Sequence, residues 1–280
     1  MSFEVQIFWM DVNTAFLNRL LKEDVYEAQP KGFIDPHFPD HVLYLKKAFY
    51  GLKQAPRALY DRLTQYLVSH RFTRGNADQT LFIKKEDGEL IVTQVYVDDI
   101  IFRSTKDELA HGFSKIMQAE FEMSVIGELT HFLRLQIHQQ DSGIFLSQSK
   151  YTKNLVKKFG SESVSSVRTP TSPNVKLTVD LLGKSVDSSL YRSMISSLLY
   201  LTANRPDISY SVGVCARYQA NSKESHMTAL KRIIKYVKTT AEFGVWYSKD
   251  TNDVLVGYSD ADWVGNVDDR KSTSRVLLCG

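Results

Sequence analysis

The feature that most constrains the fold is a pair of adjacent carboxylates, Asp98 and Asp99, between two apolar and β-branched runs. Residues 94–102 read QVYVDDIIF, a pattern typical of a strand, a tight turn and a returning strand. Neighbouring side chains on an extended chain point to opposite faces, so the two carboxylates cannot both face an apolar core. Burying an unpartnered carboxylate is very costly. The stretch therefore predicts either a divalent-metal site or a solvent-exposed turn, in which Asp is common.

A third acidic residue favours the metal site. Residues 3–10 are mostly apolar and strand-like, and this run ends at Asp11. A helix is expected to follow over residues 13–23, from the spacing of its apolar residues. Two-metal phosphoryl transfer uses two ions about 4 Å apart that hold the attacking and leaving oxygens. A carboxylate at a strand end and two more at a hairpin tip suit that chemistry, so we expect Asp11 to lie close to Asp98 and Asp99.

The rest of the chain mixes strands with helices, which predicts an α+β fold. Further strands are expected at residues 42–45, 79–85, 89–97, 100–103, 132–138, 144–148, 242–249 and 254–257. Further helices are expected at residues 56–70, 105–121, 150–159, 189–204, 206–219 and 223–240. A stretch rich in Ser and Pro, residues 161–188, is expected to be a linker.

Composition and charge set wide bounds on function. At 280 residues, the chain is long enough for one large or two modest domains. Lys and Arg number 35 against 32 Asp and Glu, a balance compatible with a nucleic-acid partner but shared by many proteins without one. Two cysteines exclude a disulfide framework or a Cys-ligated metal site. The chain shows no signal peptide and no apolar run near ~18 residues, so we expect an intracellular protein with no membrane partner.

The last predicted helix has a cationic face that could contact duplex phosphates, with an ordinary solvated face as the alternative. Its basic residues are Lys223, Lys231, Arg232, Lys235 and Lys238.

Four motifs resemble the Pol polyprotein of Ty1/copia retrotransposons. YVDD at residues 96–99 resembles the YxDD box of reverse transcriptases. MDVNTAFLN at residues 10–18, YGLKQAPR at residues 50–57 and GYSDADW at residues 257–263 resemble other segments of that polyprotein, in the same order. The resemblance implies a reverse transcriptase followed by the start of an RNase H domain.

The same resemblance implies a domain plan. Residues 1–160 would form a polymerase palm, an antiparallel sheet with helices, together with partial fingers and the start of the thumb. After the linker at residues 161–188, residues 189–241 would form a helical thumb or connection, and residues 242–280 a truncated RNase H-like β segment. Asp260 matches the first metal-binding carboxylate of an RNase H fold. Since the chain holds no residues for the other carboxylates of that site, no RNase H activity is expected. At the other end of the chain, Met1 need not be a native start.

The resemblance also implies a reaction, RNA-directed DNA synthesis. The implied partners are an RNA or DNA template with its primer, deoxynucleoside triphosphates and the rest of the Pol polyprotein, in the cytoplasm within a virus-like particle or in the nucleus. Asp11 and Asp98 would bind two Mg²⁺ ions, with Mn²⁺ as an alternative. The Val12 carbonyl would be an extra ligand, and Asp99 a secondary ligand or a source of local charge.

Four further residues take roles from the resemblance. Phe16 matches the aromatic that blocks a ribose 2′-hydroxyl, with a packing aromatic as the alternative. Gln54 and, more weakly, Lys53 would line the pocket of the incoming nucleotide. Tyr96 would pack near the primer terminus.

Some residues depart from the family pattern. Arg19, Arg134 and Arg275 stand where such proteins usually have Gly, and Leu59 replaces a Trp. A bulky residue at positive φ strains the backbone, so each Arg is expected to disturb a turn. The alternatives are therefore a catalytically dead remnant that at most binds nucleic acid, or a gene product that does not fold stably.

Overall fold

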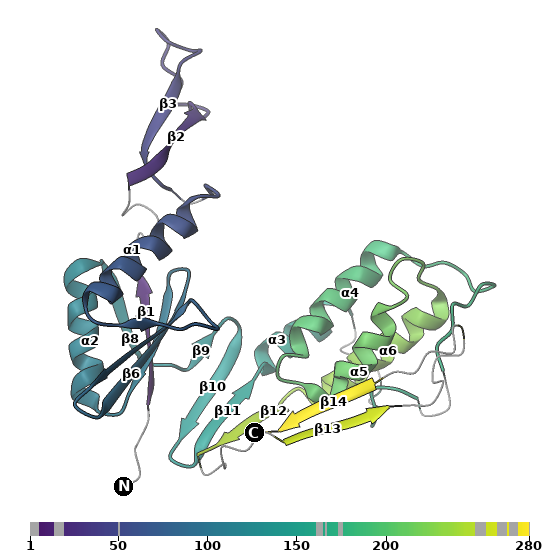
Figure 1. Ribbon diagram of the computed structural model, residues 1–280. Helices are drawn as coiled ribbons and strands as arrows, with labels where there is room; N and C mark the ends of the chain where they lie inside the picture. Colours follow the sequence, from purple (N-terminus) through teal and green to yellow (C-terminus); the bar gives the residue numbers. More distant parts are fainter. Residues whose placement is uncertain are drawn as a thin grey trace. The chain divides into compact units, whose positions relative to one another are not determined.

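The computed structural model forms two compact units, Met1–Leu129 and Thr130–Gly280 (Figure 1). It describes residues 6–13, 20–49, 51–160, 165, 167–172, 176–249, 256–261, 268 and 274–279.

The first unit is built on a six-stranded antiparallel sheet. Its strands are β1 (Ile7–Val12), β4 (Thr73–Arg74), β5 (Leu81–Glu86), β6 (Glu89–Tyr96), β7 (Asp99–Ser104) and β8 (Met123–Glu128). Their order is β4-β5-β6-β7-β1-β8, so β1 lies between β7 and β8, strands that come about a hundred residues later. This long-range pairing determines what stands beside Asp11.

Two helices, α1 (Ala55–Ser69) and α2 (Asp107–Glu120), share one core with the sheet (Figure 1). In α1, buried leucines recur every four residues, at Leu59, Leu63 and Leu67, so a single apolar face meets the core. Pro56 lies in the first turn, where its missing N–H costs no hydrogen bond. The predicted α+β class, an antiparallel sheet with helices, is confirmed.

A separate two-stranded hairpin corrects one predicted helix. β2 (Leu20–Ala28) pairs with β3 (Val42–Lys47), so the helix predicted over residues 13–23 is wrong for residues 20–23. Residues 14–19 lie outside the described residues. Val25 and Tyr26 favour extended backbone, and the Tyr26 ring packs 5.4 Å from that of Tyr44 on β3. Pairing with a distant strand therefore overrides the local helical spacing.

The second unit combines a four-stranded sheet, a strand pair and a helical core. The sheet has the order β12-β11-β10-β9, and β13 (Val256–Ala261) pairs with β14 (Ser274–Cys279). The sheet strands are β9 (His131–Phe132), β10 (Leu135–Gln140), β11 (Gly143–Ser147) and β12 (Gly244–Ser248). The helices are α3 (Ser149–Lys158), α4 (Ser188–Leu201), α5 (Pro206–Ala216) and α6 (Glu224–Thr239).

The predicted boundaries after residues 160 and 241 both fall within this second unit. β12, expected to begin an RNase H-like segment, is hydrogen-bonded to β11 as an edge of the same sheet. The division into palm, thumb or connection, and RNase H-like parts stays a prediction. Among the described residues, no helix is both long and apolar enough to span a membrane.

Arg134 lies where the sequence predicts strain. It has φ of +65° in the turn between β9 and β10, the left-handed region that favours glycine. Arg275 instead lies within β14, paired with Asp260, so the strained turn expected there is wrong. Arg19 lies outside the described residues.

Candidate active site

The strand register brings the first acidic residue to the Asp98–Asp99 hairpin. On β1 and β7, Asp11 pairs with Asp99, and the Val12 N–H donates to the Asp98 carbonyl at 3.0 Å. Directly opposed residues on antiparallel strands have Cα atoms about 4.5–5.5 Å apart and side chains on the same face. The Asp11 and Asp99 side chains therefore leave one face of the sheet as neighbours.

That face points away from the helices. Met10 and Ile100, the residues adjacent to the two acids, are fully buried in the core shared with α1 and α2. Since side chains alternate along a strand, Asp11 and Asp99 emerge on the opposite face. Tyr96, about half exposed, is paired with Asp99 on the other side and extends the same row.

The turn that carries Asp98 is backbone-strained. Tyr96 pairs with Asp99, which leaves Val97 and Asp98 as a two-residue loop, and Val97 has φ of +57°. Turns of type II′ require positive φ at that first loop position, normally supplied by Gly. A β-branched residue there is an outlier, and such strain tends to occur at functional sites.

The three acids repel one another. Partial burial, followed by the charges of Asp98 and Asp99, raises the pKa of Asp11. Burial also raises the pKa of Asp99, as does Asp98, against a hydrogen bond from Trp9 that lowers it. In the part of the chain that the structure describes, no Lys or Arg forms an ion pair with any of the three. As far as the described residues go, the negative charge of the three acids has no basic partner, and a cation would relieve their repulsion.

Trp9 is a residue of this site that the sequence pattern did not single out. Its indole Nε1–H donates to Asp99 Oδ1 at 2.8 Å. The signal was present: Trp9 lies two residues before Asp11 on the same strand, and alternation puts both side chains on one face. Only the pairing of β1 with β7 shows that Asp99 is within its reach.

The donor set suits a divalent cation, because Mg²⁺ prefers carboxylate oxygens. Among the described residues, however, no three His, Cys, Asp or Glu side chains are arranged as a ready metal site. The backbone thus brings the acids together, and their role as ligands stays a prediction.

The other predicted residues lie in several elements. Lys53 and Gln54 lie directly before the first residue of α1. Lys53 is exposed and Gln54 is half-buried. Asp260 lies in β13 of the second unit. Phe16 lies outside the described residues.

The predicted cationic face of α6 needs a correction. Lys223 is only 9% exposed and its Nζ donates to Ser185 Oγ at 3.0 Å, so it belongs to the packed start of the helix. Arg232 donates to the Thr169 carbonyl and hydroxyl oxygens. Lys231 remains exposed, so the phosphate-binding prediction now depends on a smaller surface.

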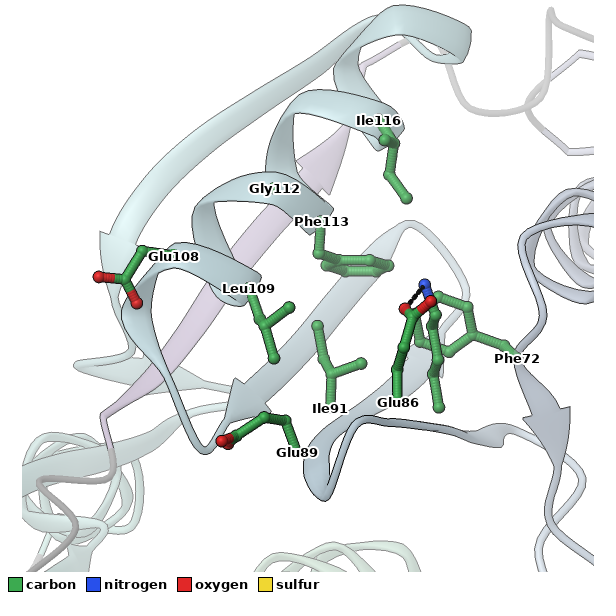
Figure 2. A pocket seen from close by; sticks show the side chains of 10 residues that line it. Phe72, Glu86, Glu89, Ile91, Glu108, Leu109, Gly112, Phe113 and Ile116 are labelled. Carbon is green, nitrogen blue, oxygen red and sulfur yellow. Dashed lines mark ion pairs between the residues drawn. The ribbon is translucent and has the colours of Figure 1, made fainter.

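A separate hollow of about 220 Å³ lies between α2 and the β5–β6 hairpin (Figure 2). Glu86 at its edge is paired with Lys84 at 2.7 Å, and Glu89 with Lys106 at 2.7 Å. Glu89 begins β6 and Tyr96 ends it, which puts them about 24 Å apart along an extended strand. The hollow is therefore distinct from the acidic site, and two of its carboxylates, Glu86 and Glu89, already have a lysine partner.

Comparisons with known proteins agree with the motif pattern. Residues 2–173 match the family model described as Reverse transcriptase (RNA-dependent DNA polymerase). The chain is 38% identical over 269 residues to the Retrovirus-related Pol polyprotein from transposon RE1 of Arabidopsis thaliana, which covers 96% of this chain and 18% of that polyprotein. It is 29% identical over 254 residues to the Putative transposon Ty5-1 protein YCL074W of Saccharomyces cerevisiae, with 90% of this chain and 82% of that protein covered.

A further relative is the Uncharacterized mitochondrial protein AtMg00810 of Arabidopsis thaliana, 32% identical over 180 residues, with 64% of this chain and 75% of that protein covered. The predicted resemblance to Ty1/copia-type Pol polyproteins is confirmed. The chain spans 18% of the length of the RE1 polyprotein.

Proposed function

Because the chain belongs to the reverse transcriptase (RNA-dependent DNA polymerase) family, we propose that it carries the catalytic acids for template-directed DNA synthesis. The reaction is the attack of a primer 3′-hydroxyl on the α-phosphorus of a deoxynucleoside triphosphate, with pyrophosphate leaving. An RNA or DNA template with its primer would be the nucleic-acid partner, and the rest of a Pol polyprotein the protein partner.

One observation carries this proposal: Asp11 stands opposite Asp99 on the open face of the sheet, at the end where the hairpin presents Asp98. Burial raises the pKa of Asp11 and of Asp99, and the charges of neighbouring acids raise both pKa values further. Such an arrangement lowers the stability of the folded protein unless a ligand offsets the repulsion. The ligand that suits carboxylates is a hard cation.

In this proposal Asp11 and Asp98 would hold a pair of Mg²⁺ ions, with Mn²⁺ as an alternative, and the Val12 carbonyl would add a donor. Bound divalent ions supply Lewis-acid activation of the attacking hydroxyl and neutralise charge on the triphosphate. Asp99 supports the set as a secondary ligand.

The remaining roles belong to the chain's own side chains. Tyr96, which is exposed and paired with Asp99, would contact the primer terminus. Gln54 and Lys53 would line the nucleotide pocket, and Phe16 would exclude a ribose 2′-hydroxyl.

Primer extension on poly(rA)/oligo(dT) with Mg²⁺ tests the function. Asp98→Asn removes one negative charge, and we expect incorporation to fall at least 100-fold, since the loss of a charged group at the reacting centre typically costs several kcal/mol. The matched control is Asp87→Asn in the β5–β6 turn, an exposed Asp at φ of +51° that should leave incorporation unchanged. Absence of incorporation by folded wild-type protein would instead support the alternative, a dead remnant that at most binds nucleic acid.

A further inference from the structure

We propose that the Trp9 indole is a positioning residue that fixes the Asp99 carboxylate, so that Asp99 offers Oδ2 rather than both oxygens to a divalent cation at the acidic site. This inference rests on the proposed function, since it concerns how the same acids take a metal. The inference goes beyond the proposed function by giving Trp9 a role and by distinguishing Asp99 from Asp98.

The contact crosses the sheet diagonally. Trp9 is paired with Ile101 on β7, and Asp99 lies two residues from Ile101, on the same face. Diagonal neighbours have Cα atoms about 7–8 Å apart, a gap that an aromatic side chain can span. The observed bond, Nε1 to Oδ1 at 2.8 Å, has the length of a charge-assisted hydrogen bond.

The chemistry of the indole makes the contact directional. Trp has one N–H and no acceptor, so it can bind only one carboxylate oxygen and carries no charge of its own. The indole can hold the Asp99 carboxylate without competing with a bound cation. A Lys or Arg in a salt bridge with this carboxylate would compete. The indole N–H occupies one lone pair of Oδ1, which leaves Oδ2 as the oxygen with both lone pairs open.

Asp98 differs in this respect. It lies in the two-residue loop, tied to β1 through its backbone carbonyl, which accepts from the Val12 N–H. Among the hydrogen bonds between described residues, the Trp9 indole is the side-chain donor found at the three acids. Within the described part of the chain, the site therefore pairs one carboxylate oriented by a side-chain donor with one that no side-chain donor orients.

Metal binding by the full chain, without nucleotide or primer, tests this role. Free Mn²⁺ is measured by electron paramagnetic resonance as protein is titrated in. Trp9→Phe keeps an aromatic ring and removes the N–H, and we expect the Mn²⁺ dissociation constant to rise about 10-fold, the low end of what outer partners of metal ligands contribute. Trp9→Gln, which restores an N–H donor of similar reach, should recover part of the affinity.

The matched control is Trp246→Phe. Trp246 lies in β12 of the second unit and is 43% exposed, so this change should leave Mn²⁺ affinity unaltered. A second measurement uses the wild-type protein alone. Tb³⁺ bound at the acids should emit when the tryptophans are excited, because an indole that touches a ligand carboxylate transfers energy efficiently.

The outcomes separate the two proposals. Mn²⁺ binding that Asp98→Asn abolishes but Trp9→Phe leaves unchanged would overturn the role of Trp9 and leave the proposed function standing. A wild-type protein that binds no Mn²⁺ would overturn both. If Trp9→Phe does not fold, the Tb³⁺ experiment decides, and bound Tb³⁺ without tryptophan-sensitised emission overturns the inference.

Discussion

At the scale of single residues, burial and mutual repulsion of the acids lower the stability of the folded protein. The pKa of Asp11 is raised by partial burial and by the charges of Asp98 and Asp99, so ionisation is easier in the unfolded chain than in the folded one. Between the unfolded value near 3.8 and the higher folded value, the folded protein binds more protons. Stability must then fall as pH rises through this window.

Asp11→Asn should therefore stabilise the protein at neutral pH while it removes a proposed ligand. We expect a rise in Tm of about 1–3 °C at pH 7, since partly exposed charges interact by less than about 1 kcal/mol. The advantage over the wild type should shrink as pH is lowered toward 3.8, where Asp11 becomes protonated. Thermal melts from pH 3.5 to 7 measure this, and a variant less stable than the wild type at pH 7 would contradict the repulsion.

At the scale of elements, alternation along β1 determines the geometry of the site. Met10 and Val12 point into the core, which forces Asp11 to the other face between them. The strand is held on both sides, by β7 and by β8. The core residues of β1 thus determine where the acid stands.

Met10→Ala tests the strength of that anchor. Met10 is fully buried, and truncating such a side chain typically costs about 2–5 kcal/mol of unfolding free energy. Urea denaturation followed by circular dichroism measures the loss. A matched truncation on the open face, Ile7→Ala, should cost less because Ile7 is only half-buried. Equal costs for the two variants would argue against this orientation of β1.

The elements also show what a sequence can and cannot predict. The leucines spaced four apart in α1 and the apolar strands around Asp98 predicted their structures closely, because the signals are local. The helix predicted at residues 13–23 was wrong where β2 pairs with β3, and β12 joined an unexpected sheet. The bond from Trp9 to Asp99 joins residues 90 positions apart, so it depends on long-range register that no local pattern contains.

At the scale of the whole molecule, the described residues form two hydrophobic cores. One is shared by α1, α2 and the six-stranded sheet, and the other by α3 to α6. Leu63 and Leu198 are fully buried in the first and second core, respectively. Each unit therefore has its own apolar contribution to stability.

Leu198→Ala should weaken the second unit by about 2–5 kcal/mol and leave the first unit largely unaffected. Amide hydrogen exchange followed by mass spectrometry would show faster exchange in α4 to α6 and unchanged protection in β6 and β7. Leu63→Ala is the reciprocal variant, with the effect expected in the first unit. Equal loss of protection in both units from either variant would mean that they unfold as one.

The central claim is that Asp11 and the hairpin acids act together in nucleotide transfer. The most direct measurement is single-nucleotide incorporation by Asp11→Asn, with Mg²⁺ and a primed template, beside the wild type and Asp87→Asn. We predict that the wild type and Asp87→Asn extend the primer and that Asp11→Asn, though folded and at least as stable, does so at least 100-fold more slowly. Undiminished extension by Asp11→Asn would contradict the account.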